Sequence, residues 1–350
     1  MNFPDGTLGV KLIGGKYYAF SDSWLVPSLG RPGLQGVTSP DINNLASNFT
    51  ISTPSTNVAL GSAGQFDQNY VGGGPMLYDA ADGLLIMMYH GEYWFGSFTP
   101  FISGLGLAVS RDLGATWTKL GVVILANTPR SGCGSPASLD MGSGGMDARA
   151  DGYTYAYFVD TPNQCENGEI YTGVARASTA ALIAAALAGG QPSGSLFQKY
   201  SGGSFSQPGV LDTSNHALGG GTSDNISPAF LMYLPSVKWN SYIGKYIASY
   251  IVPWSGLSIA FSSDGLTWTN PTTVLTGGVQ PGGANAYLYG TLINTDGGDP
   301  DTLGSSFWMY YVDLVNNDWS STNLDRVQIT ITSAGASKPN PPATLKASAH

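Results

Sequence analysis

Two carboxylates near the beginning of the chain are the residues best placed to do chemistry. Asp5 and Asp22 lie 17 positions apart at the open ends of a predicted β-hairpin, and neighbouring strands are only about 4.8 Å apart. Two carboxylates on one surface are the requirement for glycoside hydrolysis: one stays protonated and donates to the leaving oxygen, and the other ionises to act as base or nucleophile. Their like charges would separate the two pKa values. We therefore expect Asp5 and Asp22 to form an acid/base or nucleophile pair.

Residues that suit sugar binding follow other strands of similar type. The candidates are Trp24, His90, Glu92 and Trp254, with Trp94 as a further aromatic residue. An aromatic ring can stack on a sugar ring, and a histidine beside carboxylates can bind a hydroxyl or change a pKa. The structural alternative is that the tryptophans pack between sheets and that His90 satisfies backbone carbonyls.

Three further acids come at strand ends or just beyond a strand. Asp140 is the candidate for a third catalytic carboxylate, whereas Asp160 and Asp313 have no partner that the sequence reveals. A strand-end acid can also cap a loop, so each has a purely structural alternative.

A repeated pattern of strands must position these residues. Each unit begins with an inner strand, turns tightly, returns as an aromatic second strand and continues into a third. The predicted inner strands are 8–12, 75–78, 136–139, 228–233 and 287–293, and the second strands are 16–21, 84–89, 153–159, 242–251 and 306–312. Five units over about residues 5–333 predict an all-β fold, a five-bladed β-propeller. A six-bladed ring is the alternative if the Ser/Asn-rich residues 30–70 contain a short extra blade.

Propeller topology explains why the candidate residues belong together. Inner strands all begin on one face of the ring, and second strands return to that face, so residues before an inner strand share a rim with residues after a second strand. One helix is predicted at 178–187, because this Ala-rich run is followed by Gly189-Gly190. We expect it on the outside of the third blade.

Two phrases in the chain are nearly the same, 106–117 and 256–268. Each has an apolar strand, Ser-x-Asp, Gly and Thr-Trp, and Asp and Gly there suit a tight turn. The phrase resembles the Asp-box, a β-hairpin found in propellers of secreted carbohydrate-active enzymes. Asp112, Asp264, Trp117 and Trp268 are expected to be structural.

The opening segment 4–24 resembles the first blade of bacterial five-bladed propellers that include endo-D-arabinanases. An acid followed by Gly precedes a strand, a Gly turn and an aromatic strand, although Phe20-Ser-Asp-Ser23 replaces Phe-Gly-Asp-Thr. Gly173-Val-Ala-Arg176 and the two Asp-box phrases also fit this family. The resemblance implies that acids on this rim, here Asp5 and Asp22, carry catalysis on an arabinan-type polysaccharide.

More distant resemblances lead to two other families. Propellers that cleave L-arabinan and xylan also have an acid before the first inner strand, but their further acids begin inner strands two and three, where this chain has 74–76 and 135–137 without acids. Asp140 and Asp147 are the nearest substitutes. Sialidases need three arginines around a carboxylate, which here would have to be Arg31, Arg130 and Arg149.

Composition excludes several classes of protein. The 350 residues include 48 Gly, 21 Pro and 19 Tyr, only 11% are charged, and the net charge is −9. This favours strands joined by turns, and it leaves no basic stripe for nucleic acid. No apolar run has the roughly 18 residues of a membrane span. No signal peptide is present in the sequence; we expect a secreted protein with a propeller at 1–335 and a linker at 336–350 that leads to a further domain.

No cofactor is required by any motif in the chain. A disulfide between Cys133 and Cys165 would suit an extracellular protein, and two buried thiols are the alternative. A structural calcium near the axis stays open, although no ligand loop is recognisable. Besides hydrolysis of a polysaccharide, a non-catalytic carbohydrate-binding or interaction propeller and a sialidase remain as alternatives.

Overall fold

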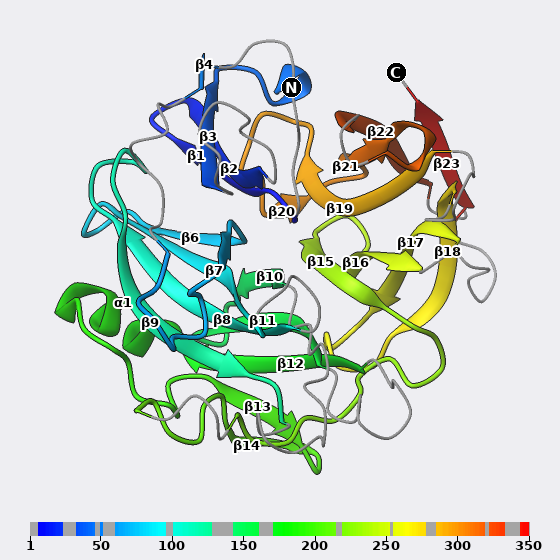
Figure 1. The fold of residues 1–350 in the computed structure, drawn as a ribbon. Helices are drawn as coiled ribbons and strands as arrows, with labels where there is room; N and C mark the ends of the chain where they lie inside the picture. The colour runs from blue at the N-terminus through cyan, green and yellow to red at the C-terminus, as the bar shows by residue number, and fades with distance from the viewer. Residues whose placement is uncertain are drawn as a thin grey trace.

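Five β-sheets lie in a ring around a common axis in the computed structural model (Figure 1). The described residues are 6–23, 33–45, 50–51, 60–95, 101–127, 143–160, 171–214, 219–252, 255–277, 285–318, 322–332 and 344–349. Among them every strand pair is antiparallel except β15 with β20. The chain is an all-β, five-bladed propeller, as the sequence predicts.

The first two blades come from the first third of the chain. Blade one contains β1 (Gly9–Ile13), β2 (Lys16–Ser23), β3 (Gly33–Ser39) and β4 (Thr50–Ile51). Blade two contains β5 (Tyr70–Gly72), β6 (Met76–Asp79), β7 (Leu84–Trp94), β8 (Phe101–Ser110) and β9 (Thr118–Leu125). Because 33–39 and 50–51 belong to blade one and 70–72 to blade two, the described part of 30–70 holds no sixth blade.

The remaining three blades follow in chain order around the ring. Blade three contains β10 (Ser143–Ala148), β11 (Tyr153–Asp160), β12 (Tyr171–Ser178), β13 (Gln198–Ser201) and β14 (Ser204–Pro208). Blade four contains β15 (Tyr233–Asn240), β16 (Lys245–Val252), β17 (Gly256–Ser262), β18 (Thr269–Thr276) and the added β20 (Thr302–Leu303). Blade five contains β19 (Ala286–Asn294), β21 (Ser306–Leu314), β22 (Thr322–Thr332) and β23 (Thr344–Ala349).

Two faces of the ring follow from this order. We call the face where the inner strands β1, β5, β10, β15 and β19 begin the starting face, and the face with their hairpin turns the hairpin face. The second strands β2, β7, β11, β16 and β21 pair antiparallel with the inner strands. Their last residues therefore return to the starting face.

Five buried hydrophobic clusters fill the five seams between blades. Alternate residues of a strand point to opposite sides of a sheet, so that in β7 Leu84 and Ile86 pack toward blade three, while Leu85 and Met87 pack toward blade one. The seam between blades five and one is filled in the same way. This packing on both sides explains why the second strands are apolar over nearly their full length.

Three inner strands differ from the sequence prediction. In blade three β10 occupies 143–148 rather than 136–139, in blade four β15 occupies 233–240 rather than 228–233, and in blade two β5 precedes β6. The cause in blade three is composition: Ser-Gly-Gly-Met-Asp-Ala reads as a loop, and its strand conformation is imposed by pairing with β11. The expected strand 136–139 lies outside the described residues.

The predicted helix is confirmed as α1 (Thr179–Ala188), which lies at the outer edge of blade three (Figure 1). Ser178 caps its beginning, and Gly189 ends it in the left-handed conformation with φ 73°.

The expected C-terminal linker differs in part. Within 336–350 the residues 344–349 form β23, which pairs with β22 along its whole length. The division of the chain into a propeller and a linker otherwise stays a prediction.

Candidate active site

Most of the predicted catalytic and binding residues fall outside the described part of the chain. These are Asp5, Asp140, Trp24 and Trp254, together with Cys133 and Cys165. Their roles stay predictions. For Asp22 the backbone is described: it lies next to the end of β2 and pairs with Leu34 of β3. This is the strand position on the starting face that the sequence predicts for it.

The observed bounds of β10 place Asp140 before the inner strand of blade three in the sequence, and not after it as predicted. In the sequence Asp140 stands three positions before β10, the inner strand of blade three. It therefore has the same relation to its inner strand that Asp5, four positions before β1, has to blade one. In blade two the equivalent position is Asp67, three positions before β5, an acid that the sequence prediction had not placed before an inner strand.

Asp67 itself is a structural residue. Its side chain is 2% exposed. Its Oδ2 accepts hydrogen bonds from the Tyr89 hydroxyl at 2.9 Å and from the Lys119 ammonium at 2.6 Å. Burial and the Asp67 carboxylate raise the pKa of Tyr89 well above its ordinary value. Because both partners lie in blade two's sheet, Asp67 holds that sheet together.

His90 and Glu92 lie side by side near the end of β7, on the starting face. The His90 Nε2 and Glu92 Oε1 are 3.0 Å apart, and the Trp94 indole Nε1 donates to Glu92 Oε2 at 2.7 Å. Tyr70 of β5 contacts the His90 ring edge-on, with 5.8 Å between ring centroids. Both oxygens of Glu92 thus fix an aromatic or imidazole ring.

The two remaining strand-end acids have partners that the sequence did not reveal. Asp160 is fully buried, and its Oδ2 accepts from the Lys199 ammonium at 3.2 Å and from the Ser223 hydroxyl at 2.8 Å. Burial lowers the pKa of Lys199 and the Asp160 charge opposes this shift. With no exposed surface, Asp160 is a structural ion-pair partner.

Asp313 is different, because it lies at the starting-face end of β21 beside a second acid. Burial and the charge of Asp325 raise its pKa, and a hydrogen bond from the Asn285 amide at 3.0 Å opposes this. Burial also raises the pKa of Asp325. The other oxygen of Asp313, Oδ1, is buried and has no hydrogen-bond partner among the described residues. The sequence did not single out Asp325, because its place beside Asp313 depends on the pairing of β21 with β22. In that pairing Asp325 lies opposite Tyr311.

Irregular backbone marks the inner strands near the starting face. Register shifts interrupt β10, β15 and β19, and Leu234 and Tyr289 adopt positive φ of 50° and 55°. Bulges redirect side chains and are common beside functional sites. The Ser249 hydroxyl stabilises one of them by donating to the Gly290 carbonyl at 2.6 Å. The inner strands are thus bent near the starting face.

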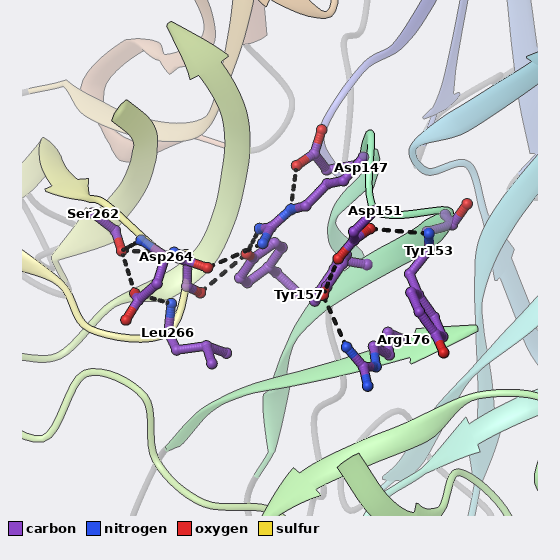
Figure 2. A network of polar contacts seen from close by, with 12 residues as sticks. Asp147, Asp151, Tyr153, Tyr157, Arg176, Ser262, Asp264 and Leu266 are labelled. Atoms are coloured by element: carbon purple, nitrogen blue, oxygen red, sulfur yellow. Dashed lines mark hydrogen bonds and ion pairs between the residues drawn. The ribbon is translucent and has the colours of Figure 1, made fainter. Parts of the chain in front are cut away.

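On the hairpin face Arg149 joins blades three and four, and Figure 2 shows its partners Asp147, Tyr157 and Asp264. Its Nε donates to Asp147 Oδ2 at 2.9 Å and its Nη1 to the Asp264 carbonyl at 3.1 Å, and Nη2 contacts the Tyr157 hydroxyl. The guanidinium also lies 3.9 Å from the ring centroids of Tyr155 and Tyr246. An arginine bound in this way on the opposite face cannot join a clamp at the predicted rim, which argues against the sialidase alternative.

The two Ser-x-Asp turns have the structural role that the sequence predicts. Asp112 Oδ1 accepts from the Thr116 amide at 2.8 Å, and Asp264 Oδ1 accepts from the Leu266 and Thr267 amides, each at 2.8 Å. Burial disfavours ionisation, but these hydrogen bonds outweigh it and lower the pKa of both carboxyl groups. Trp268 packs edge-on against Tyr157.

Metal sites and membrane spans were sought over the same part of the chain. The described residues contain no group of three or more His, Cys, Asp or Glu that could bind a metal ion. No described helix has the length and hydropathy to cross a membrane.

Comparison with known proteins relates the chain to solved structures only. No protein-family model matches it, and no curated protein sequence does. An α-L-arabinanase from Cellvibrio cellulosa complexed with arabinohexaose matches with a TM-score of 0.57 at 12% identity, over 99% of this chain and 96% of that one. A GH43_1 enzyme from Xanthomonas citri complexed with xylotriose matches with a TM-score of 0.55 at 10% identity, over 97% and 89%.

A third structure is longer than this chain. An exo-β-1,3-galactanase from Phanerochaete chrysosporium with β-1,3-galactotriose matches with a TM-score of 0.54 at 11% identity over 93% of this chain, which spans 60% of the galactanase. At such identities the likeness shows a shared fold.

Proposed function

We propose that this protein is a secreted glycoside hydrolase that cleaves an arabinan-type polysaccharide on the starting face of its propeller. The main support is the likeness in fold, over almost the whole of both chains, to an arabinanase complexed with arabinohexaose. The Asp22 backbone beside the end of β2 and the His90–Glu92–Trp94 cluster near the end of β7 agree with a site on this face.

The proposed reaction needs two carboxyl groups in different protonation states. One of Asp5 and Asp22 transfers its proton to the glycosidic oxygen as the bond to the anomeric carbon breaks, and the other, ionised, either deprotonates the attacking water or attacks the anomeric carbon itself. Asp140 is the proposed third carboxylate, placed before β10 in the sequence. Its negative charge would raise the pKa of the acid.

The sugar would be bound by residues beside these carboxylates. His90 and Glu92 provide polar groups, and Trp24 and Trp254 are the proposed stacking surfaces. No cofactor takes part in this proposal.

The test is release of reducing sugar by the wild type and by Asp22→Asn from D-arabinan, L-arabinan, xylan, galactan and a sialoside. We expect release from one polymer and a loss of about 10²–10⁴-fold in the variant, the usual contribution of an acid or base. Asp82→Asn is the matched control, because it removes an exposed carboxylate from the β6–β7 turn on the hairpin face. Thermal unfolding checks that both variants fold.

Two outcomes would contradict the proposal. Equal rates for wild type and Asp22→Asn would remove Asp22 from the mechanism. No release from any polymer by the folded wild type would favour a carbohydrate-binding or interaction propeller.

A further inference from the structure

A cavity lies at the axis on the hairpin face, away from the proposed catalytic rim. Its volume is about 530 Å³, within the roughly 300–1,000 Å³ of small-molecule sites. Its wall includes Lys11 of blade one, Leu77 of blade two, Asp147 of blade three, Trp239 of blade four and Asp301 of blade five. Ala148, Ala150 and Asp299 in the wall are exposed, so the cavity reaches the protein surface.

The axis narrows sharply on the way to the starting face. The next cavity along it is only about 20 Å³, with walls that include Val10, Met76, Met146 and Val237. Such a volume has room for about one water molecule. A ligand of several atoms in the larger cavity would therefore enter and leave through the hairpin face.

The polar groups of the larger cavity still have bonding capacity. The Asp147 side chain is 7% exposed and gives only Oδ2 to Arg149, so that Oδ1 has no partner among the described residues. Figure 2 shows a dashed line to only one of the two Asp147 oxygens. The Lys11 side chain, 10% exposed, contacts Asp301, and its two other N–H groups have no partner in the described part of the chain. Acceptor and donor thus coexist in one wall.

An aromatic residue forms another wall. Trp239 is half-buried, and it packs edge-on against Tyr246 with 4.9 Å between ring centroids. Its indole Nε1–H has no hydrogen-bond partner among the described residues. A tryptophan held by a neighbouring ring, with an N–H left to donate, is the kind of group that binds the apolar face of a sugar ring.

Most charges of the wall are paired. Lys11 and Arg149 are cationic, and Asp147, Asp299 and Asp301 are anionic. Asp301 lies between Lys11 and Lys238, a residue outside this wall, and Asp147 is bound to Arg149. A cavity whose charges are paired in this way has little preference for anions or cations. It favours a neutral ligand whose groups can both donate and accept hydrogen bonds.

We propose that this cavity is a second, non-catalytic binding site for a neutral oligosaccharide. A sugar ring stacks on Trp239, and its hydroxyl groups donate to Asp147 Oδ1 and accept from Lys11 Nζ. The choice of a glycan as ligand rests on the proposed function, whereas the position and the donor set rest on the geometry of the cavity. The site would hold a second stretch of polysaccharide while the starting face acts on the first.

The experiment measures hydrogen–deuterium exchange of the catalytically impaired Asp22→Asn variant with arabinohexaose, xylotriose or β-1,3-galactotriose. We expect one of these sugars to protect 146–152 and 239–246, the backbone around the cavity. Adding Trp239→Ala should raise the sugar concentration for half-protection there about tenfold, as for a central aromatic contact. Tyr242→Ala is the matched control, because Tyr242 is an exposed aromatic residue on the same hairpin and outside the cavity wall.

A second variant covers the case in which Trp239→Ala does not fold. Trp239→Phe keeps a ring against Tyr246 but removes the N–H donor, and it should weaken protection by a smaller factor than Trp239→Ala. Protection of 146–152 that neither variant weakens would overturn the inference, as would the absence of protection there with all three sugars.

The two proposals fail in different ways. Protection around the cavity that depends on Trp239, in a protein that cleaves no polymer, would support the binding site and contradict the hydrolase. Hydrolysis that Asp22→Asn abolishes, without protection of 146–152, would support the hydrolase and contradict the second site.

Discussion

At the scale of single residues, environment separates aspartates that composition alone treats alike. Asp112 and Asp264 accept hydrogen bonds from their own turns, which lower their pKa even though burial opposes ionisation. Asp313 is buried beside Asp325, and both effects raise its pKa. The first two residues are therefore suited to stabilising a turn, and Asp313 is suited to carrying a proton.

Asp313→Asn should make the protein more stable at neutral pH. The folded state raises the pKa of Asp313, so that ionisation above its unfolded pKa favours unfolding. Asparagine removes that cost and fills the same volume. We expect a higher melting temperature for the variant at pH 7 and a difference that disappears as the pH falls below about 4. A variant that is less stable at pH 7 in calorimetry would contradict the assigned direction.

Glu92→Ala should weaken substrate binding more than turnover. The carboxylate fixes His90 through Oε1 and Trp94 through Oε2, and lost hydrogen bonds to a charged group correspond to about a tenfold effect or more. Initial rates on the polymer from which the wild type releases sugar should give a KM raised about tenfold with kcat nearly unchanged. Glu92→Gln, which can still accept from Trp94, is the control. An equal fall in kcat for both variants would instead place Glu92 in the chemical step.

At the scale of elements, two turn glycines differ in how strongly the structure requires them, because only one lies close to a neighbouring blade. Gly114, in the turn after β8, has φ 86°, and a Cβ there would lie 2.0 Å from Phe20 Cζ of blade one. Phe20 is itself packed against Trp117 at 5.3 Å between centroids. Gly83, in the turn before β7, has φ 66°, but a Cβ would meet no atom within 4 Å.

Gly114→Ala should therefore destabilise the protein far more than Gly83→Ala. Positive φ alone costs an alanine about 1 kcal/mol, which is the expectation for Gly83→Ala. At Gly114 the clash adds an overpacking cost, for a total of about 3 kcal/mol or more. Chemical denaturation measures both variants. Similar losses for the two would show that the contact with Phe20 adjusts freely.

At the scale of the whole molecule, side-chain contacts close the ring between blades five and one, and one short strand links blade five to blade four. In the described residues no strand from the beginning of the chain enters the sheet of blade five. Blades five and one instead meet through the Trp308 indole, which donates to Asn43 Oδ1 at 2.7 Å, and through the Leu8 amide, which donates to the Thr291 hydroxyl at 2.9 Å. The connection between β19 and β21 contributes β20 to blade four. It also brings Asp301 to Lys11 and Lys238.

Asp301→Asn should loosen this closure in a manner that depends on pH. Burial disfavours the charge, but Lys11 and Lys238 outweigh burial and lower the pKa of Asp301 from 3.8 to about 2. A lowered pKa contributes stability above the unfolded value, and this contribution is lost as the pH falls towards 2. The variant should lose about 2 kcal/mol at pH 7. Its unfolding free energy should converge with that of the wild type near pH 2; a constant difference down to that pH would contradict the ion-pair explanation.

The sequence by itself determined the elements that depend on local chemistry. Aromatic and β-branched runs predicted all five second strands, Ser-x-Asp with a Gly one or two positions later predicted the two turns, and Ser178 with Gly189 predicted the bounds of α1. Topology then followed from repetition, and with it the expectation that Asp22 and His90 lie on one face. These features need only neighbouring residues or a regular repeat.

Only the tertiary structure decided what depends on contacts between distant segments. β10 and the part of β15 beyond Tyr233 are strands because their partners impose it, which local propensity cannot reveal. The partners of Asp160 and Asp313, the binding of Arg149 to the Asp264 carbonyl and the axial cavity all join residues from separate strands or blades. A pairing between segments far apart in sequence leaves no local pattern, because each residue is selected by a neighbour that only folding brings near.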